Sequence, residues 1–175
     1  MDTSMSTPLF TPHTCSECGQ TTDYDLPLDK GSAMIVLAVA NAVRRLNKNS
    51  VHFERDMLGQ HEGGESYFSM IRGGYMTPMM ARNIARPRYH GLIAFVEKGT
   101  GEYLLTRKGA DFIRGAPVKR IALIDKVLGK NAGYLETGGE TTIHELLRKE
   151  TPMWAANLEE LRTAFAGEEM TASML

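Results

Sequence analysis

The sequence predicts an α+β protein, because segments with helical periodicity are followed by segments with the character of β-strands. Residues 30–48 carry apolar side chains at helical spacing and follow Asp29, a plausible N-capping residue. Residues 92–97 and 102–106 are short apolar runs separated by four residues that include two glycines, a pattern typical of a β-hairpin. We therefore expect one main domain in which helices precede a small antiparallel sheet.

We expect three parts along the chain. Residues 1–27 are rich in Thr, Ser, Pro and Asp without an apolar period, which predicts an extended N-terminal arm. Residues 28–116 hold the helices and the hairpin and form the predicted central domain. Residues 117–175 predict a C-terminal extension with a strand or β-hairpin followed by helices.

The first helix of the central domain is strongly apolar. Val36, Val39 and Val43 repeat at helical spacing, and the neighbouring apolar residues widen this surface. Arg44 and Arg45 suit the negative end of the helix dipole. We expect nearly all of the first three turns to be buried, either as the central helix of the domain or in a dimer interface.

The next segments are short, and one of them has clear boundaries. A strand is predicted at residues 51–53, and short helices are predicted at residues 54–58 and 65–71. Thr77 is an N-cap candidate before Pro78, and a helix should continue to Ala85, with Pro87 ending or kinking it.

The end of the central domain and the extension are predicted in the same way. Thr106 caps a helix that Gly115 terminates, and residues 119–128 form a strand or a small hairpin. Helices are predicted at residues 141–148 and 152–165. The last one carries a single apolar stripe, formed by Trp154, Leu158, Leu161 and Phe165.

Composition favours a cytoplasmic protein without a membrane partner. The longest apolar run, residues 33–40, is too short to cross a bilayer, and the first ten residues lack the features of a secretory signal. The sequence holds no G-x-S-x-G, no H-E-x-x-H and no paired-carboxylate motif, so we expect no enzyme activity.

Charge is distributed unevenly along the chain. The net charge is −1, yet residues 71–120 hold ten basic and three acidic residues. An anionic partner responds to such a local concentration of charge, which favours nucleic-acid binding. The alternative is a charged surface that pairs with acids elsewhere in the fold.

The two cysteines, Cys15 and Cys18, form a C-x-x-C pair that matches one half of a zinc site. His13 is a nearby third ligand candidate, and Gly19 suits the tight turn of a zinc knuckle. Tetrahedral zinc needs four ligands, so a thiol pair without metal is the alternative.

One segment carries a family resemblance. Residues 88–115 contain Gly91-Leu92-Ile93, a predicted hairpin, and then Leu105-Thr106-Arg107-Lys108-Gly109. This succession resembles the winged helix-turn-helix proteins, in which a recognition helix leads into a hairpin wing and a further helix. The C-x-x-C placed before the domain is loosely similar to small winged-helix proteins of phages and mobile elements.

The resemblance implies duplex DNA as the partner, a role in transcription regulation or as an accessory factor, and a homodimer that contacts paired half-sites. In this architecture one helix enters the major groove and the wing contacts the backbone or the minor groove. Helical spacing places four side chains, those of Met79, Arg82, Asn83 and Arg86, on one face of the helix that Thr77 begins. The predicted contact surface also includes Thr77, Arg88, Lys98, Arg107 and Lys108.

A protein-interaction module built on the same fold is the alternative function. It would bind and modulate another protein, for example as a phage-encoded inhibitor of a host enzyme. Met76, Met79 and Met80 would form its contact patch, because methionine-rich surfaces adapt to partners.

Overall fold

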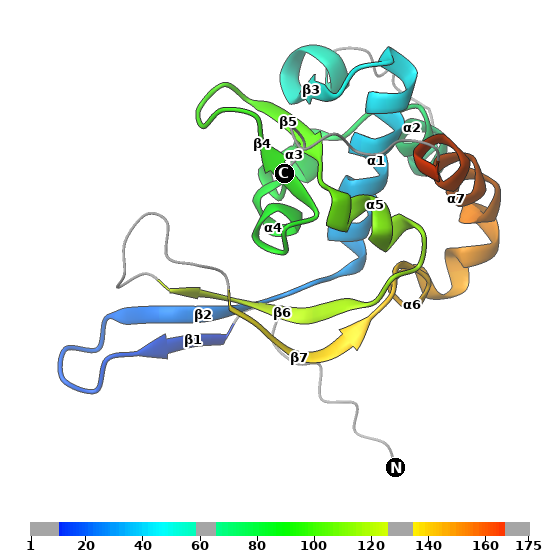
Figure 1. Ribbon diagram of the computed structural model, residues 1–175. Coiled ribbons are helices and arrows are strands. Elements are labelled where there is room, and N and C mark those ends of the chain that lie inside the picture. The colour runs from blue at the N-terminus through cyan, green and yellow to red at the C-terminus, as the bar shows by residue number, and fades with distance from the viewer. Residues whose placement is uncertain (1–10, 59–65, 126–134, 167–175) are drawn as a thin grey trace.

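The protein is an α+β fold with two small antiparallel sheets, as the computed structural model shows (Figure 1). The structure describes residues 11–58, 66–125 and 135–166. None of the helices in these ranges combines the length and the apolarity that crossing a bilayer requires. In chain order the elements are β1 (Thr11–Thr14), β2 (Thr21–Pro27), α1 (Lys30–Leu46), β3 (Ser50–His52), the π-helical turn η1 (Phe53–Leu58), α2 (Tyr67–Arg72), α3 (Pro78–Arg82), α4 (Ala85–Tyr89), β4 (Ile93–Phe95), β5 (Glu102–Leu105), α5 (Arg107–Ile113), β6 (Val118–Asp125), β7 (Leu135–Thr141), α6 (Ile143–Leu147), the 3₁₀ turn η2 (Arg148–Glu150) and α7 (Thr151–Ala166).

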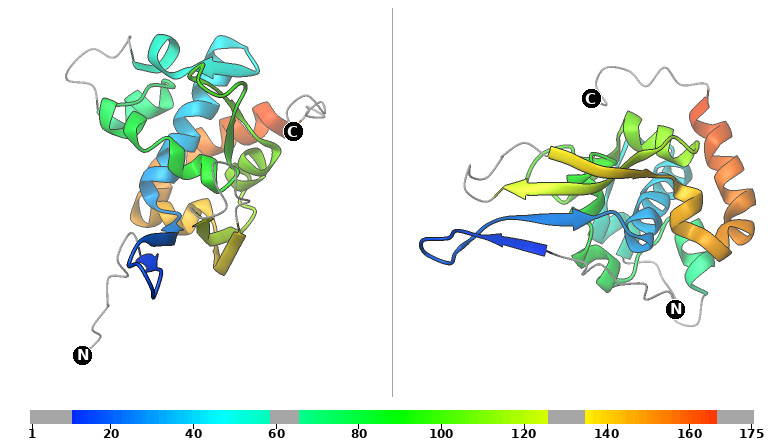
Figure 2. Two further views of the ribbon diagram at one scale, coloured as in Figure 1. Left: turned by 90° about the vertical axis from the view of Figure 1, so that its left-hand side faces the viewer. Right: turned by 90° about the horizontal axis from the view of Figure 1, so that it is seen from below.

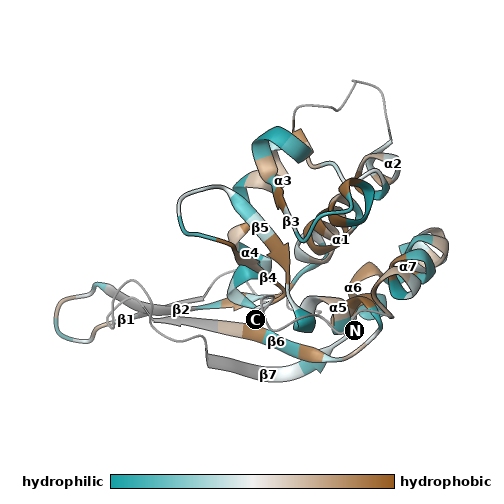
Figure 3. Cartoon of the chain, turned by 45° about the horizontal axis from the view of Figure 1, so that its top comes forward, coloured by the Kyte–Doolittle hydropathy of each residue, from teal (hydrophilic) through white to brown (hydrophobic). Residues whose placement is uncertain are grey.

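Helix α1 is the centre of the molecule. The Asp29 carboxylate accepts the backbone N–H of Ser32 at 2.8 Å and caps the helix, and Asn47 ends it in the left-handed conformation. Every residue from Ser32 to Val43 is buried, and apolar residues cover most of the helix in Figure 3. Helices α2, α4, α5, α6 and α7 and strand β5 all contact it. The prediction of a buried first helix is therefore confirmed, and this chain itself covers the apolar surface that suggested a dimer interface.

A three-stranded sheet in the order β3-β5-β4 lies against α1. Strand β5 is the middle strand, and its residues Tyr103 and Leu105 are buried. The loop between β4 and β5 projects from the body (Figure 1). These strands agree with the predicted strand at residues 51–53 and with the predicted hairpin.

Close packing at the start of α5 requires a glycine at position 109. Thr106 caps the helix, because its side-chain oxygen accepts the N–H of Gly109 at 3.0 Å. A Cβ atom at Gly109 would lie 2.0 Å from the carbonyl oxygen of Leu92, so no larger residue fits without moving the backbone. The Thr106 hydroxyl also donates to the Gly91 carbonyl at 2.5 Å. These contacts join α5 to the segment that precedes β4.

The second sheet connects the two ends of the chain. Its strand order is β1-β2-β6-β7, and β2 pairs antiparallel with β6 through contacts such as Asp25 with Leu123. Residues from the predicted arm and the predicted extension therefore share one sheet. The β1–β2 hairpin extends beyond the body of the protein (Figures 1 and 2).

The last helices close the core on the other side of α1. The four residues of the predicted apolar stripe on α7 are buried within this chain: Trp154, Leu158, Leu161 and Phe165. The side chain of Asn157, also on α7, exchanges hydrogen bonds with Asn41 of α1 at 2.8 and 3.0 Å. The second surface that favoured a homodimer is thus also covered within the chain.

Candidate nucleic-acid interface

Two short helices stand where the sequence predicts one helix from Thr77 to Ala85. Thr77 caps α3 as expected, with its side-chain oxygen accepting the Met80 N–H at 3.2 Å. The helix ends at Arg82, however, and α4 begins at Ala85, so the prediction of one continuous helix is wrong.

Pro87 provides the physical reason for this break. In a continuous helix the N–H of residue 87 would bond to the carbonyl of Asn83, but proline has no N–H and its ring collides with that carbonyl. The Asn83 carbonyl instead accepts the N–H of Arg86 at 3.0 Å. Pro87 then lies in the first turn of α4, where a missing N–H leaves no partner unsatisfied.

The break separates the four side chains that helical spacing had placed on one face. Met79 and Arg82 are on α3 and exposed. The Asn83 side-chain amide donates to the Met79 carbonyl at 3.1 Å. The guanidinium of Arg86 pairs with the carboxylate of Asp29 at 2.7 Å. Asn83 and Arg86 are therefore engaged within the chain.

Arg88 is held between α4 and β4. Its guanidinium carbon lies 4.5 Å from the ring centre of Tyr89 and 4.6 Å from that of Phe95. Such cation–π contacts stabilise the folded position of the arginine. Its Nε atom is buried and has no hydrogen-bond partner among the described residues.

The cations around the hairpin differ in exposure. Lys98 is exposed in the β4–β5 loop, where Gly99 and Gly101 adopt positive φ angles of 89° and 73°. Arg107 is exposed at the first residue of α5, whereas Lys108 is half-buried. Among the described residues Lys98 and Arg107 form no ion pair, and neither does Arg82.

Several cations of residues 71–120 are paired with acids of the same chain. Five of the ten cations in this segment form ion pairs with described residues. These pairs are Arg72–Glu160, Arg86–Asp29, Arg114–Asp111, Lys119–Glu140 and Arg120–Glu145. The partners are up to 88 residues apart, so no local pattern predicts this pairing.

The C-x-x-C pair forms a tight turn at the end of the β1–β2 hairpin. The N–H of Gly19 donates to the Cys15 carbonyl at 2.9 Å, and the N–H of Cys15 donates to the Gln20 carbonyl at 2.8 Å. Hydrogen bonds from the backbone of Cys18 and Glu17 lower the pKa of the Cys15 thiol and favour its thiolate form.

Zinc binding at this turn stays a prediction. The described residues contain no group of three or more His, Cys, Asp or Glu side chains that could hold a metal ion. For His13 only the backbone, as part of β1, is described.

The predicted methionine patch is smaller than the sequence suggested. Met76 and Met80 are buried in the core, and only Met79 is exposed. The exposed Tyr67 of α2 belongs to the wall of the same cavity as Met79, and no motif around Tyr67 marks it in the sequence.

Comparison of the chain with protein-family models, with curated proteins and with solved structures found no match.

Proposed function

We propose that this chain is a winged-helix protein that binds duplex DNA. The observation that carries the proposal is the arrangement of α1, α2 and the α3–α4 pair around a sheet with strand order β3-β5-β4. The β4–β5 hairpin, whose loop is exposed, follows these helices, and we assign it the place of the wing. In this architecture the recognition helix, whose place the α3–α4 pair takes in the proposal, and the wing contact DNA.

Three exposed cations supply the chemistry. Arg82 on α3, Lys98 in the β4–β5 loop and Arg107 at the start of α5 form no ion pair among the described residues and can each neutralise a phosphate. Arginine can also bond to guanine O6 and N7 in the major groove, which makes Arg82 the candidate for base contact. The other predicted cations contribute less, because Arg86 is paired and Arg88 is stacked on aromatic rings.

Three phosphate contacts imply modest, salt-sensitive binding. The logarithm of the association constant should fall with the logarithm of salt concentration with a slope of about −2.7. Affinity would then drop roughly fortyfold between 50 and 200 mM salt. This is a weaker dependence than ten independent cations would produce.

The test is fluorescence anisotropy with a labelled duplex of random sequence, at low and at moderate salt. The variant Arg82→Ala/Lys98→Ala/Arg107→Ala should lose most of the binding and most of the salt slope. The control Arg72→Ala/Lys119→Ala/Arg120→Ala removes the same charge from cations that are already paired and should bind within about twofold of wild type. No binding at low salt, or an equal loss in both variants, would refute the proposal.

A further inference from the structure

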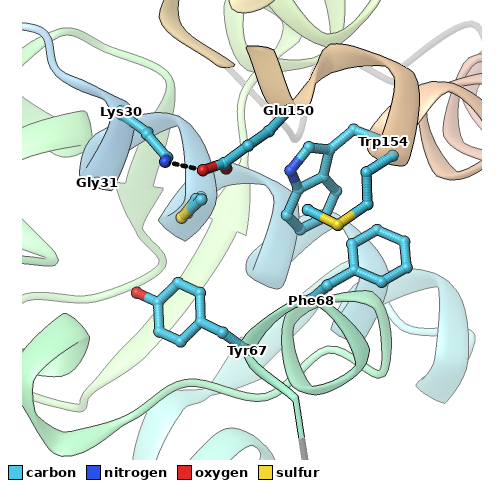
Figure 4. A pocket seen from close by; sticks show the side chains of 8 residues that line it. Lys30, Gly31, Tyr67, Phe68, Glu150 and Trp154 are labelled. Carbon is cyan, nitrogen blue, oxygen red and sulfur yellow. Dashed lines mark hydrogen bonds and ion pairs between the residues drawn. The ribbon is translucent and has the colours of Figure 1, made fainter. Parts of the chain in front are cut away.

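Two cavities adjoin at the N-terminal end of α1. The first has a volume of about 380 Å³ and is lined by residues that include Lys30, Glu150 and Trp154 (Figure 4). We call it the Trp154 cavity. The second, of about 480 Å³, lies between α1 and α3 and is lined by residues that include Met79. We call it the Met79 cavity. Gly31 and Tyr67 belong to the walls of both.

The Trp154 cavity has an unused hydrogen-bond donor in its wall. The Trp154 side chain is fully buried, and its Nε1–H has no acceptor among the described residues. Figure 4 shows that the edge of the indole ring that bears this nitrogen faces the Lys30–Glu150 ion pair. A buried donor without a partner is unfavourable, so an acceptor placed there would be stabilised.

The wall of the Trp154 cavity already contains one carboxylate, that of Glu150, beside Lys30. Glu150 accepts a hydrogen bond from the Lys30 ammonium group, and the two side chains are 35% and 46% exposed. Exposed ion pairs contribute little stability, so Glu150 can be displaced at small cost. A carboxylate that takes its place and reaches deeper could accept bonds from both Lys30 and Trp154.

The Met79 cavity has an apolar part formed by Ile35, Pro78 and Met80, and the ion pair of Asp29 and Arg86 also belongs to its wall. Met79 and Tyr67 are 73% and 46% exposed at its border. An apolar cavity with a few polar groups at one end is typical of a small-molecule site. Each cavity is within the volume range of small-molecule pockets.

We propose that the two cavities together bind one small carboxylate with an aliphatic tail. The ligand carboxylate displaces Glu150 from Lys30 and accepts the Nε1–H of Trp154. The tail passes Gly31 and Tyr67 and lies in the Met79 cavity. The binding is non-covalent, and it is independent of the DNA-binding proposal.

Decanoate is the probe, and the intrinsic fluorescence of the chain's single tryptophan, Trp154, is the signal. Below its micellar concentration, decanoate should change this fluorescence saturably. Decanol and decylamine should bind more weakly, because neither presents a carboxylate to Lys30 and Trp154. No saturable response to decanoate, or an equal response to decylamine, would overturn the proposal.

Variants of the two residues of the Lys30–Glu150 ion pair should change decanoate affinity in opposite directions. Glu150→Gln removes the competing carboxylate and should tighten decanoate binding several-fold, whereas Lys30→Met should weaken it by about tenfold, as expected when a charge-assisted hydrogen bond is lost. A purely structural ion pair would not produce this difference in sign. Weaker or unchanged binding by Glu150→Gln, measured on a variant whose thermal unfolding matches wild type, would therefore contradict the proposed site.

Gly31 tests the path of the tail. An added Cβ at this position meets only the Asp29 side chain, at 3.5 Å or more, so substitutions fit the backbone. Gly31→Leu should obstruct the passage between the cavities and abolish decanoate binding, while Gly31→Ala should retain it. Equal binding by both variants would rule out a ligand that spans the two cavities.

Discussion

The two ends of α1 differ in how firmly they are tied to the rest of the molecule. At the C-terminal end, the Arg45 guanidinium donates to the carbonyls of Gly73 and Asp56 and lies 4.6 Å from the ring centre of Tyr75. At the N-terminal end, Asp29 and Lys30 form ion pairs with Arg86 and Glu150 and border cavities of about 380, 480 and 560 Å³. One helix thus has an end that is bonded to the backbone of two neighbouring segments and an end that adjoins open space.

This difference indicates where the chain tolerates change. Close backbone approach and buried polar pairs make the C-terminal end sensitive to single atoms. The N-terminal end is held by partly exposed charges, which contribute little each and can exchange partners. We infer that the C-terminal end of α1 maintains the fold, while the N-terminal end is available for binding. The proposed carboxylate site lies at that end, and Arg82 of the DNA-binding proposal is on α3, which shares a cavity wall with it.

The largest effect is expected from Gly74→Ala, which places one methyl group against the packed end of α1. The added Cβ would lie 2.6 Å from the backbone of Ala42, and Gly74 has a φ of +82°. Left-handed strain and overpacking together should lower the free energy of unfolding by about 3 kcal/mol, measured by urea denaturation. The matched control, Gly31→Ala at the other end, should be neutral or slightly stabilising. Equal losses in the two variants would contradict the comparison.

Asn157→Leu should have the second largest effect. It removes two buried hydrogen bonds with Asn41 and leaves that side chain only its bond to the Ile71 carbonyl. A buried amide that loses its partners costs about 2 kcal/mol, which urea denaturation would detect. The double variant Asn41→Leu/Asn157→Leu should recover part of the loss, because neither polar group then remains. A double variant that shows the plain sum of the two single losses would indicate that the amides do not act as a pair.

Local signals explain which parts of this architecture could be predicted from the sequence. The cap at Asp29, the periodicity of residues 36–43 and the apolar stripe from Trp154 to Phe165 all act within a few residues, and the two helices that they predict, α1 and α7, both form. The β4–β5 hairpin was predictable for the same reason, because its loop joins adjacent strands.

Contacts between distant segments explain what was missed. Strand β2 pairs with β6 about a hundred residues later, and no pattern within either strand specifies that partner. A contact between distant segments also alters the candidate interface. Asp29 was identified as a cap, but its ion pair with Arg86 joins residues 57 positions apart. The break at Asn83 was also missed, but it has a local cause. Pro87 collides with the carbonyl of the residue four positions earlier, and this collision can be predicted from the sequence.

Substitutions of Asp29, at the N-terminal end of α1, should lower the free energy of unfolding less than the two changes above. Asp29→Ala removes both the cap of α1 and the ion pair with Arg86, and it should cost about 1 kcal/mol. Asp29→Asn keeps a capping oxygen and should cost about half as much. Both variants free Arg86, so both should strengthen DNA binding in the anisotropy assay. A loss of DNA affinity would show that the Asp29–Arg86 pair supports the interface.

The smallest effect concerns Asp56, beside the C-terminal end of α1. Hydrogen bonds from the Arg55 side chain and the His52 backbone N–H hold the pKa of this carboxyl below its ordinary value of 3.8. Because the folded state favours the charged form, Asp56 contributes stability at neutral pH, and this contribution is lost as pH falls through the lowered pKa. Urea denaturation at several pH values should show a weaker decline in acid for Asp56→Asn than for wild type. The Arg55 side chain is largely exposed, so the difference should be small. Identical pH profiles would mean that the Asp56 carboxylate is no better stabilised in the folded chain than in the unfolded one.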